Sequence, residues 1–361
     1  MHRVYSTRHV TEKESQRLWA RRPSPLPALL LALTALFAAV APVGAAGAGG
    51  WPAWGKREVA APAFGVAAHF LWHDLGQTTG EVARLQAAGF RTVRFDVGWR
   101  WVEPERKGRY DAAVLAKLDA ILAQLAMAGI APIVTVIETP AWARPAGTAI
   151  FTPPTDPQDY ADLLGMLAAR YVGAQSLTWE IWNEPNLIEF WATVPNPVQY
   201  TALLRRAYTA IKAVAPGATV LAGSIAFNDR PYLEGMYAAG AAGAFDGLAI
   251  HPYTAGRAPG DDREVWFSLR AQLSDMQAIL AAHGEGWKGL YLTEFGWSLD
   301  DVDEATRADY MRQAVALLRQ YPQVRVACAY TIAQGDNPAY GLIATSGAET
   351  PTWRAFAAAA R

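Results

Sequence analysis

Eight short β-rich runs recur along the chain at nearly regular intervals, and this recurrence constrains the fold more than any other feature. Turn residues bound each run, and helix-like stretches separate them. The runs are Phe64–Phe70, Thr92–Val97, Ala131–Ile137, Leu177–Trp182, Thr219–Ala222, Gly247–Ile250, Leu290–Thr293 and Val324–Thr331. Their average spacing of about 37 residues is typical of a closed parallel barrel in which a helix follows each strand. The sequence therefore predicts an α/β protein, a (β/α)8 TIM barrel, as a single domain over residues 63–361.

The stretches between the runs carry the start and stop signals of α-helices. Asp111–Met127 has apolar residues at helical spacing and closes at Gly129. A capping residue precedes a proline at Asp156, Asn196 and Thr350, which predicts three further helix starts. A doubly wound open sheet is the alternative. It would normally carry a glycine-rich phosphate loop after its first strand, and the glycines there do not make that pattern.

The composition excludes several classes of protein. The formal net charge is -1, with 52% hydrophobic and 18% charged residues. A disordered chain would be less apolar and more highly charged, and a nucleic-acid binder would usually be basic. Cys328 is the single cysteine, so the chain has neither an intramolecular disulfide nor a cysteine cluster for zinc or iron–sulfur chemistry. We therefore expect a globular protein with no nucleic-acid partner.

An uncharged segment near the N-terminus predicts export. Residues 23–55 carry no charge, and Ala28–Val43 is apolar at every position but one. This run has the length of a signal-peptide core, and Ala46–Ala48 offers a small-x-small cleavage site. We expect residues 1–48 to be a signal peptide or an N-terminal membrane anchor, with a start codon assigned too early as a further alternative. Residues 49–62 would then be a linker, and the protein would be secreted or periplasmic.

Two glutamates lie at the ends of predicted strands, where a barrel of this kind carries its reactive groups. The fourth strand ends in WEIWNEPN, which contains Glu184, and the seventh ends in LTEFGW, which contains Glu294. Three strand–helix steps separate them, which places their carboxyls on opposite sides of the barrel mouth. Glycosidic bond cleavage needs such a pair, because one carboxyl protonates the leaving oxygen while the other attacks the anomeric carbon or activates water.

These motifs resemble those of the clan A glycoside hydrolases, most closely family 39 with its exopolysaccharide-degrading relatives. The resemblance runs from about Phe64 to the C-terminus. Supporting segments fall in the same order along the chain: Thr92-Val93-Arg94, Thr139-Pro140-Ala141-Trp142-Ala143, His251-Pro252-Tyr253 and Tyr340-Gly341-Leu342. The resemblance implies a TIM-barrel glycosidase that retains the anomeric configuration and uses no metal or organic cofactor.

The resemblance also implies roles for individual residues. Glu184 would be the general acid/base, and Glu294 would be the nucleophile. Asn183 would bind the 2-hydroxyl of the sugar. Arg94 would hydrogen-bond the nucleophile and favour its ionised form.

Further residues would line the same subsite or stack on sugar rings. His251 and Tyr253 would belong to the subsite, with Tyr253 close to the nucleophile. Trp142, Trp182 and Trp297 are candidate platforms, because the apolar face of a pyranose stacks on an indole ring. Trp99, Trp101 and Trp191 are further candidates for stacking on a sugar ring.

Two sets of residues do not follow the family pattern. The acids Asp96, Glu138 and Glu180 lie on or just beyond strands, and we expect them to support Arg94, His69 or His251. Many relatives also carry a Trp on strand eight that forms the floor of the cleaved-sugar subsite. This chain has Tyr330 in that strand and no Trp, so either the tyrosine substitutes or the floor is missing.

The sequence thus predicts a hydrolase of a β-linked glycan that touches a membrane only through its N-terminal segment. Aromatic residues in several loops, notably Trp142, Trp191 and Trp297, favour a groove with several sugar subsites and therefore endo cleavage. A transglycosylase on the same scaffold and a non-catalytic glycan-binding or polysaccharide-assembly protein are the alternatives. A metal-dependent barrel hydrolase is a weaker one, because the histidines do not combine into a recognisable ligand spacing.

Overall fold

The computed structural model describes residues 62–174 and 176–361. The predicted signal or anchor segment over residues 1–48, and the linker up to residue 61, lie outside the described residues. Among the residues that are described, no helix is both long enough and apolar enough to cross a membrane.

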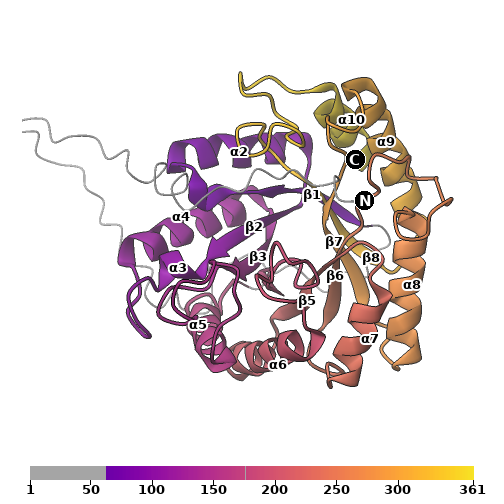
Figure 1. Ribbon diagram of the computed structural model, residues 1–361. Helices are drawn as coiled ribbons and strands as arrows, with labels where there is room; N and C mark the ends of the chain where they lie inside the picture. Colours follow the sequence, from indigo (N-terminus) through magenta and orange to yellow (C-terminus); the bar gives the residue numbers. More distant parts are fainter. Residues whose placement is uncertain (1–61, 175) are drawn as a thin grey trace, which may run out of the picture. The chain divides into compact units, whose positions relative to one another are not determined.

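Within the described residues, eight parallel strands close into a barrel in chain order (Figure 1). They are β1 (Ala63–Ala68), β2 (Thr92–Gly98), β3 (Ala131–Ile137), β4 (Thr178–Ile181), β5 (Thr219–Ala226), β6 (Gly247–His251), β7 (Gly289–Phe295) and β8 (Val324–Ala329). Each predicted run coincides with one strand to within a few residues. The largest difference is at β5, which continues four residues beyond the predicted end at Ala222. The predicted TIM barrel is confirmed.

Helices surround the barrel and cover the outer face of the sheet (Figure 1). Those that the structure describes are η1 (Phe70–Trp72), α2 (Leu75–Ala88), α3 (Trp99–Val102), α4 (Ala112–Ala128), α5 (Pro157–Arg170), α6 (Pro197–Val214), α7 (Arg230–Ala238), α8 (Leu269–Ala282), α9 (Glu304–Leu318) and α10 (Pro351–Ala360). Apolar side chains fill the space between helices and strands.

The predicted helix boundaries are confirmed where the sequence carried a clear signal. Asp111 caps α4 by accepting hydrogen bonds from two backbone amides, and Gly129 ends it in the left-handed region, at φ 69°. Asp156, Asn196 and Thr350 cap α5, α6 and α10 in the same way, each followed by a proline in the first turn.

The interior of the barrel changes from apolar to polar along its axis. Ile133, Leu221 and Ala249 pack together inside it, with Tyr291 and Val326 against them. Because alternate residues of each strand point inward, the next inward positions toward the carboxyl ends follow the same strands. There the side chains are charged or polar, and they form the site described next.

Candidate active site

Six of the predicted site residues come together where the strands end. They are Arg94 from β2, Asn183 and Glu184 after β4, His251 from β6, Tyr253 after β6 and Glu294 from β7, and none is more than 7% exposed. The carboxyl ends of parallel barrel strands meet at one mouth, which explains why residues 200 positions apart become neighbours.

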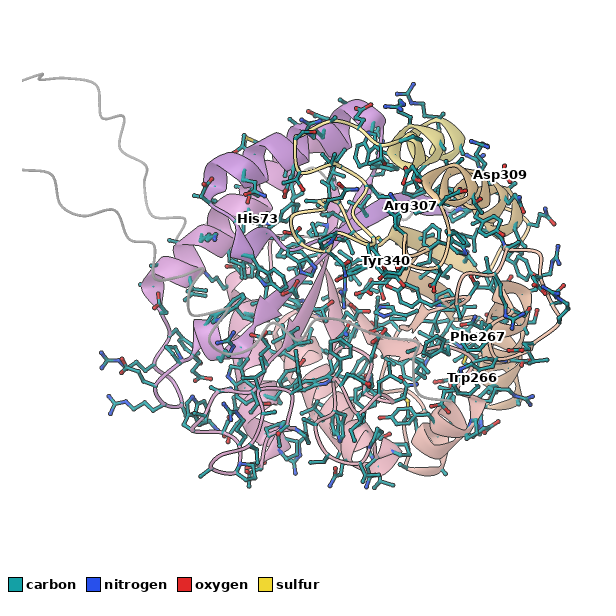
Figure 2. All side chains as sticks on the ribbon, turned by 45° about the horizontal axis from the view of Figure 1, so that its top comes forward. His73, Trp266, Phe267, Arg307, Asp309 and Tyr340 are labelled. Atoms are coloured by element: carbon teal, nitrogen blue, oxygen red, sulfur yellow. The ribbon has the colours of Figure 1, made fainter. Side chains whose placement is uncertain are left out.

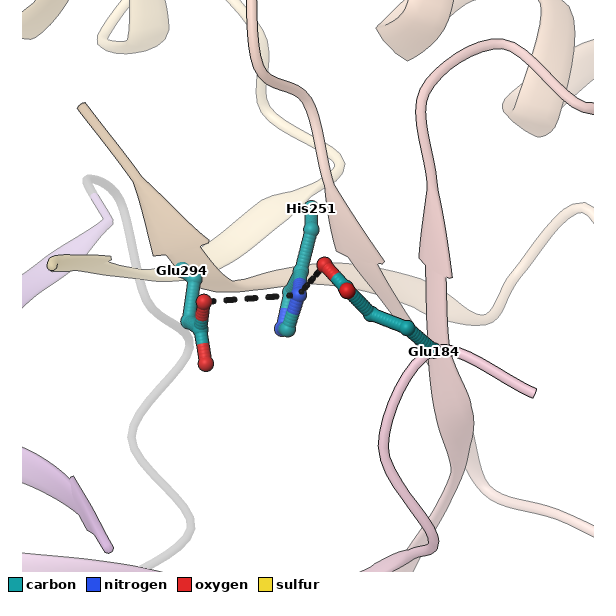
Figure 3. Close-up of side chains that lie close together, drawn as sticks. All are labelled: Glu184, His251 and Glu294. Carbon is teal, nitrogen blue, oxygen red and sulfur yellow. Dashed lines mark hydrogen bonds and ion pairs between the residues drawn. The ribbon is translucent and has the colours of Figure 1, made fainter. Parts of the chain in front are cut away.

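The two predicted catalytic carboxyls face each other across the ring of His251 (Figure 3). Glu184 Oε1 lies 2.7 Å from His251 Nδ1, and Glu294 Oε2 lies 3.6 Å from the same nitrogen. One oxygen of each carboxyl and the ring nitrogen all lie within 4.8 Å of one another. Tyr253 donates its hydroxyl hydrogen to Glu294 Oε2 at 2.7 Å, which fixes that carboxyl in place.

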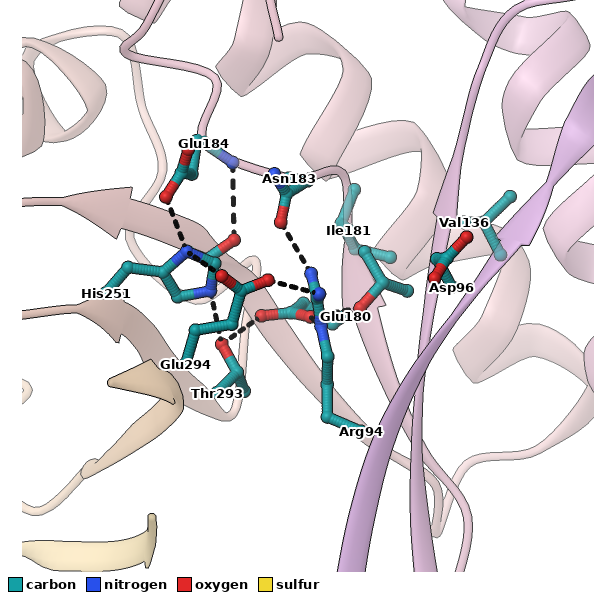
Figure 4. A network of polar contacts seen from close by, with 12 residues as sticks. Arg94, Asp96, Val136, Glu180, Ile181, Asn183, Glu184, His251, Thr293 and Glu294 are labelled. Atoms are coloured by element: carbon teal, nitrogen blue, oxygen red, sulfur yellow. Dashed lines mark hydrogen bonds and ion pairs between the residues drawn. The ribbon is translucent and has the colours of Figure 1, made fainter. Parts of the chain in front are cut away.

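Arg94 connects its own strand β2 with the ends of β4 and β7 (Figure 4). It donates from Nε to Glu180 Oε2 at 2.9 Å, from Nη1 to Glu294 Oε1 at 2.6 Å, and from Nη2 to Asn183 Oδ1 at 2.5 Å. Burial alone would lower the pKa of Arg94, but the charges of Glu180 and Glu294 outweigh it and raise that pKa. The guanidinium therefore stays ionised and orients both the carboxyl and the amide.

The environment of Glu184 favours its protonated form. Burial raises the pKa of Glu184 to about 8, although the positive charge of Arg94 opposes the rise. Burial also lowers the pKa of His251, to about 4, so the imidazole is neutral at neutral pH. A protonated carboxyl donates to a ring nitrogen that carries no hydrogen, and this requires the ring hydrogen of His251 to sit on Nε2.

A chain of hydrogen bonds below the ring is consistent with that tautomer. His251 Nε2 lies 3.1 Å from Thr293 Oγ1, and Thr293 donates to Glu180 Oε1 at 2.5 Å. Burial acts to raise the pKa of Glu180, but the charge of Arg94 outweighs it and lowers that pKa. The ionised Glu180 accepts the threonine hydrogen, so the threonine oxygen is left to accept from His251 Nε2. Arg94 and Glu184 are thus linked through three buried residues.

The backbone that presents Glu184 is strained. Glu184 has φ 41° and Trp182 has φ 71°, both in the left-handed region that costs a non-glycine residue on the order of 1 kcal/mol. Contacts to β5 hold this conformation. The Glu184 amide donates to Ser224 Oγ at 3.3 Å, and the Asn186 side chain exchanges two hydrogen bonds with the backbone of Ala226.

The same three side chains form the one group of histidines and acids among the described residues that is arranged to hold a metal ion. A divalent cation bound by Glu184, His251 and Glu294 would displace the hydrogen bond between the first two. It would also lie close to the positive guanidinium of Arg94, which already donates to Glu294. The donor set fits a cation poorly, because both oxygens of Glu294 already accept hydrogen bonds.

Several of the predicted sugar platforms are buried in the core. The prediction for Trp182 is wrong: it is 0% exposed and packs edge-on against Tyr160 and Trp191. Trp99 and Trp191 are equally buried, so neither offers a face to a ligand. The sequence pattern did not separate core indoles from surface ones, because both follow strand ends.

The other tryptophans differ in how much of the ring is accessible. Trp297 is 3% exposed and donates to the carbonyl of Arg257 at 2.7 Å. Trp142 is half-buried and donates to the carbonyl of Glu103 at 2.8 Å, and Trp101 is also half-buried. Trp142 therefore presents more surface to a ligand than Trp297 does.

The supporting acids have the predicted partners in two cases of three. Glu180 binds Arg94, and Asp96 Oδ1 lies 2.6 Å from His69 Nδ1. The expectation for Glu138 is wrong, because it binds Arg100 at 2.8 Å instead. Glu138 lies one residue past β3 with φ 66°, and its carbonyl also accepts from the Arg100 amide, so the chain turns toward α3.

At the end of β8, an aromatic ring is present although the tryptophan is not. Tyr330 follows the strand, its peptide bond to Thr331 is cis, and its ring packs against Tyr340 at 5.5 Å between centroids. Tyr330 also packs against the apolar cluster that contains Tyr253, whose hydroxyl donates to Glu294, and burial raises the pKa of Tyr330. Tyr330 thus occupies the mouth where many relatives have tryptophan.

Sequence reasoning missed the hydroxyl side chains of the site. Thr293 precedes Glu294 within the motif itself, and its position could have indicated a buried contact. Ser224 gave no signal, because it lies where the pairing of β5 with β6 shifts register between Ala222 and Ile225.

Comparison with known proteins places these observations in a family. The family model for cellulases, glycosyl hydrolase family 5, matches residues 55–331. No curated protein sequence matches the chain. The expected resemblance to clan A glycoside hydrolases is confirmed, with family 5 as the matching model and family 39 enzymes among the similar structures.

Solved structures share the fold at low sequence identity. A family 39 glycoside hydrolase from the gut symbiont Bacteroides cellulosilyticus has a TM-score of 0.69 and 22% identity, over 84% of this chain and 64% of that chain. A variant of GH5_18 from Streptomyces cattleya in complex with Manb1-4GlcNAc has a TM-score of 0.66 and 20% identity, over 83% and 80% of the two chains. A family 39 enzyme from Xanthomonas axonopodis pv. citri has a TM-score of 0.66 and 21% identity, over 82% and 65%. This chain therefore spans less than two thirds of the length of two of these three structures.

Proposed function

The chain belongs to the cellulase family, glycosyl hydrolase family 5, and is a glycoside hydrolase; from this premise we propose that it cleaves a β-linked glycan with retention of the anomeric configuration. The observation that carries the proposal is the spacing of the two carboxyls. An oxygen of Glu184 and an oxygen of Glu294 lie within 4.8 Å of each other. Retaining enzymes hold their carboxyls about 5–5.5 Å apart, whereas inverting enzymes leave room for a water at about 6.5–9.5 Å.

In the first step, Glu294 attacks the anomeric carbon while Glu184 protonates the departing oxygen. Arg94 and Tyr253 each donate to one oxygen of Glu294, which aims the carboxylate and keeps it from rotating. The bond from the anomeric carbon to the leaving oxygen breaks as the bond to Glu294 forms. Glu184 loses its proton to the leaving group and becomes a carboxylate.

In the second step, Glu184 acts as a base. Its carboxylate takes a proton from a water molecule, the water oxygen bonds to the anomeric carbon, and Glu294 leaves as a carboxylate. The proton taken from water stays on Glu184, and the neutral His251 accepts a hydrogen bond from it at Nδ1, as it did before the first step. Arg94 donates to Asn183 Oδ1 and orients the amide, which supports the proposal that Asn183 binds the sugar hydroxyl beside the reacting carbon.

We also propose that the enzyme acts inside a polymer. Support comes from aromatic rings that continue outward from the site. Phe227 belongs to the same apolar cluster as Tyr253, and Trp266 stacks on Phe227 with centroids 6.1 Å apart. Trp266 is 43% exposed, and Phe267 lies beside it (Figure 2). Rings arranged in this way offer a stacking surface to a further sugar, which an enzyme confined to a chain end would not need.

The test uses a panel of β-glucans, β-mannans, β-xylans and bacterial exopolysaccharides incubated with the purified protein. Proton NMR of the first-formed product reads the anomer, and chromatography of early products separates internal from terminal cleavage. Glu184→Ala and Glu294→Ala should each remove activity on unactivated substrates. Glu189→Ala is the matched control, because Glu189 is an exposed acid in the same loop.

Each result tests the mechanism, the mode of cleavage or one of the alternative functions. An inverted product anomer would overturn the double-displacement mechanism, and monomers as the only early product would overturn endo action. Transfer products that outweigh hydrolysis at high acceptor concentration would favour a transglycosylase. Binding of a polymer without cleavage would favour the glycan-binding alternative.

A further inference from the structure

A second histidine lies in the barrel mouth, and the proposed mechanism does not use it. His69 follows β1 and is 7% exposed. Its Nδ1 lies 2.6 Å from Asp96 Oδ1 on β2. Among the residues that the structure describes, its Nε2 is buried and has no hydrogen-bond partner. Buried polar atoms of folded proteins are nearly always paired, so this nitrogen calls for an explanation.

An indole with the same property covers the face of that histidine. The rings of His69 and Trp72 are stacked, with centroids 4.1 Å apart and an interplanar angle of 15°. Trp72 Nε1 is also buried and also lacks a partner within the described part of the chain. Two buried nitrogens on stacked rings therefore both lack a hydrogen-bond partner among the described residues.

The strand register places this pair at the mouth and not in the core. Ala67 of β1 pairs with Arg94 of β2, so His69 is two residues further on, at the level of Asp96. Alternate residues of a barrel strand point inward, which puts His69 and Asp96 one layer above Arg94. The ring of Tyr330 meets His69 edge-on with centroids 6.0 Å apart. The pair thus borders the mouth on the side of β1, β2 and β8.

The charge on the imidazole determines whether His69 Nε2 donates or accepts a hydrogen bond. Burial alone would lower the pKa of His69, but the charges of Asp96, Asp336 and Glu294 outweigh it and raise that pKa. A protonated His69 presents an N–H at Nε2, and an indole nitrogen is always a donor. A hydroxyl oxygen of a bound sugar would give both ring nitrogens an acceptor.

The neighbouring charges also indicate which kind of oxygen. Three carboxylates, those of Asp96, Asp336 and Glu294, act on His69. The nearby cations are already paired, because Arg94 binds Glu180 and Glu294 and His73 binds Asp336 and Glu81. A carboxylate ligand, such as that of a uronic acid, would add a further negative charge to this group. The hydroxyl oxygens of an uncharged sugar accept hydrogen bonds without that repulsion. His69 and Asp96 lie one layer above Arg94, which donates to Glu294, so the sugar concerned is on the nucleophile's side of the bond to be cleaved.

We propose that His69 and Trp72 form a hydrogen-bonding subsite that donates to hydroxyl oxygens of an uncharged sugar on the glycone side. Asp96 holds the imidazole in orientation, and the indole stacks on one face of it. The inference rests on the proposed glycosidase function and adds two residues that determine its specificity.

The experiment measures binding, so that it does not depend on turnover. Neutral β-1,4-linked tetrasaccharides of glucose, mannose and xylose, and a β-linked uronate tetrasaccharide, are titrated calorimetrically into the Glu294→Gln protein. Trp72→Phe then removes the indole N–H and keeps an aromatic ring. His69→Asn removes Nε2 and keeps an amide that can donate to Asp96. Trp287→Phe is the matched control, because Trp287 is 69% exposed and precedes β7 at the opposite end of the barrel.

We expect Trp72→Phe and His69→Asn each to weaken the binding of at least one neutral tetrasaccharide by roughly tenfold, the effect of one lost hydrogen bond. Trp287→Phe should leave binding unchanged. Affinities of both variants within about twofold of the parent, tighter binding of the uronate, or no binding of any neutral sugar would each overturn the subsite. Trp72→Phe keeps the test decisive if His69→Asn fails to fold. Sugar binding without hydrolysis by the wild-type protein would instead contradict the proposed function alone.

Discussion

Raising the pH above about 8 should remove the proton on which the leaving-group step depends. Burial raises the pKa of Glu184 from its ordinary value of 4.5 to about 8, against the opposing charge of Arg94. An acid with this pKa can donate a proton only on the acidic side of that value. For a substrate with a poor leaving group, we expect kcat/KM to fall by roughly tenfold per pH unit above this point.

The same rise in pKa also makes the stability of the fold depend on pH. The unfolded chain releases the Glu184 proton near pH 4.5, and the folded protein retains it up to about pH 8. The stability contributed by this group is therefore fully present below the unfolded pKa and is lost as the pH rises through the folded one. At about 1.4 kcal/mol per tenfold change in the ionisation constant, the loss is on the order of 5 kcal/mol.

Glu184→Gln isolates this contribution, because glutamine keeps the shape of the side chain and has no titrating proton. The free energy of unfolding in urea is measured between about pH 5 and about pH 9 for both proteins. It should fall more steeply with pH in the wild type. Glu105→Gln controls for the loss of an exposed acid, because the Glu105 side chain is 63% exposed and lies in a different loop. Parallel pH dependences for the wild type and Glu184→Gln, or an alkaline limb of kcat/KM near pH 5, would refute the reasoning.

Four further outcomes are expected. Arg94→Ala should lower kcat by roughly a hundredfold or more, because two charge-assisted contacts to carboxylates and one to an amide are lost together; steady-state kinetics near wild type would contradict the placement of β2. Thr293→Val should move the alkaline limb of kcat/KM to lower pH, because the valine no longer orders His251; an unmoved limb counts against the hydrogen-bond chain. Although burial opposes it, hydrogen bonds to two carboxyls raise the pKa of His73 to about 9. The stability that the wild type gains over His73→Gln should therefore be lost as the pH rises through that value, and thermal unfolding measures this loss. Mass analysis of the mature N-terminus should find residues 1–48 removed or membrane-bound, and a soluble cytoplasmic protein beginning at Met1 would exclude the export signal.

The secondary structure could be predicted because its signals are local. The alternation of β-rich and helical stretches places all eight strands, and Asp111 with Gly129 marks the two ends of α4. A cap or a left-handed glycine acts on backbone groups within a few residues of itself, so its effect can be recognised without the rest of the fold. The predicted strand order also places Glu184 and Glu294 at one mouth, since parallel barrel strands all end on the same side.

The contacts that give those residues their chemistry were decided by the tertiary structure. The family resemblance led us to expect a bond from Arg94 to Glu294, but nothing near Arg94 in the sequence indicates that it also binds Asn183, or that Glu138 turns away to Arg100. These partners come from different strands, and their distances depend on barrel closure and strand register.

The sequence by itself determined the barrel, the glycosidase class and the position of the two carboxyls. Only the folded chain decided which indoles are buried, as Trp182 is. It also decided which ring nitrogens lack a partner among residues 62–174 and 176–361, as in His69 and Trp72. Burial, pKa and hydrogen-bond satisfaction are properties of the whole surroundings of an atom. Those surroundings form when strands distant in the sequence come together, so no local pattern of residues can specify them.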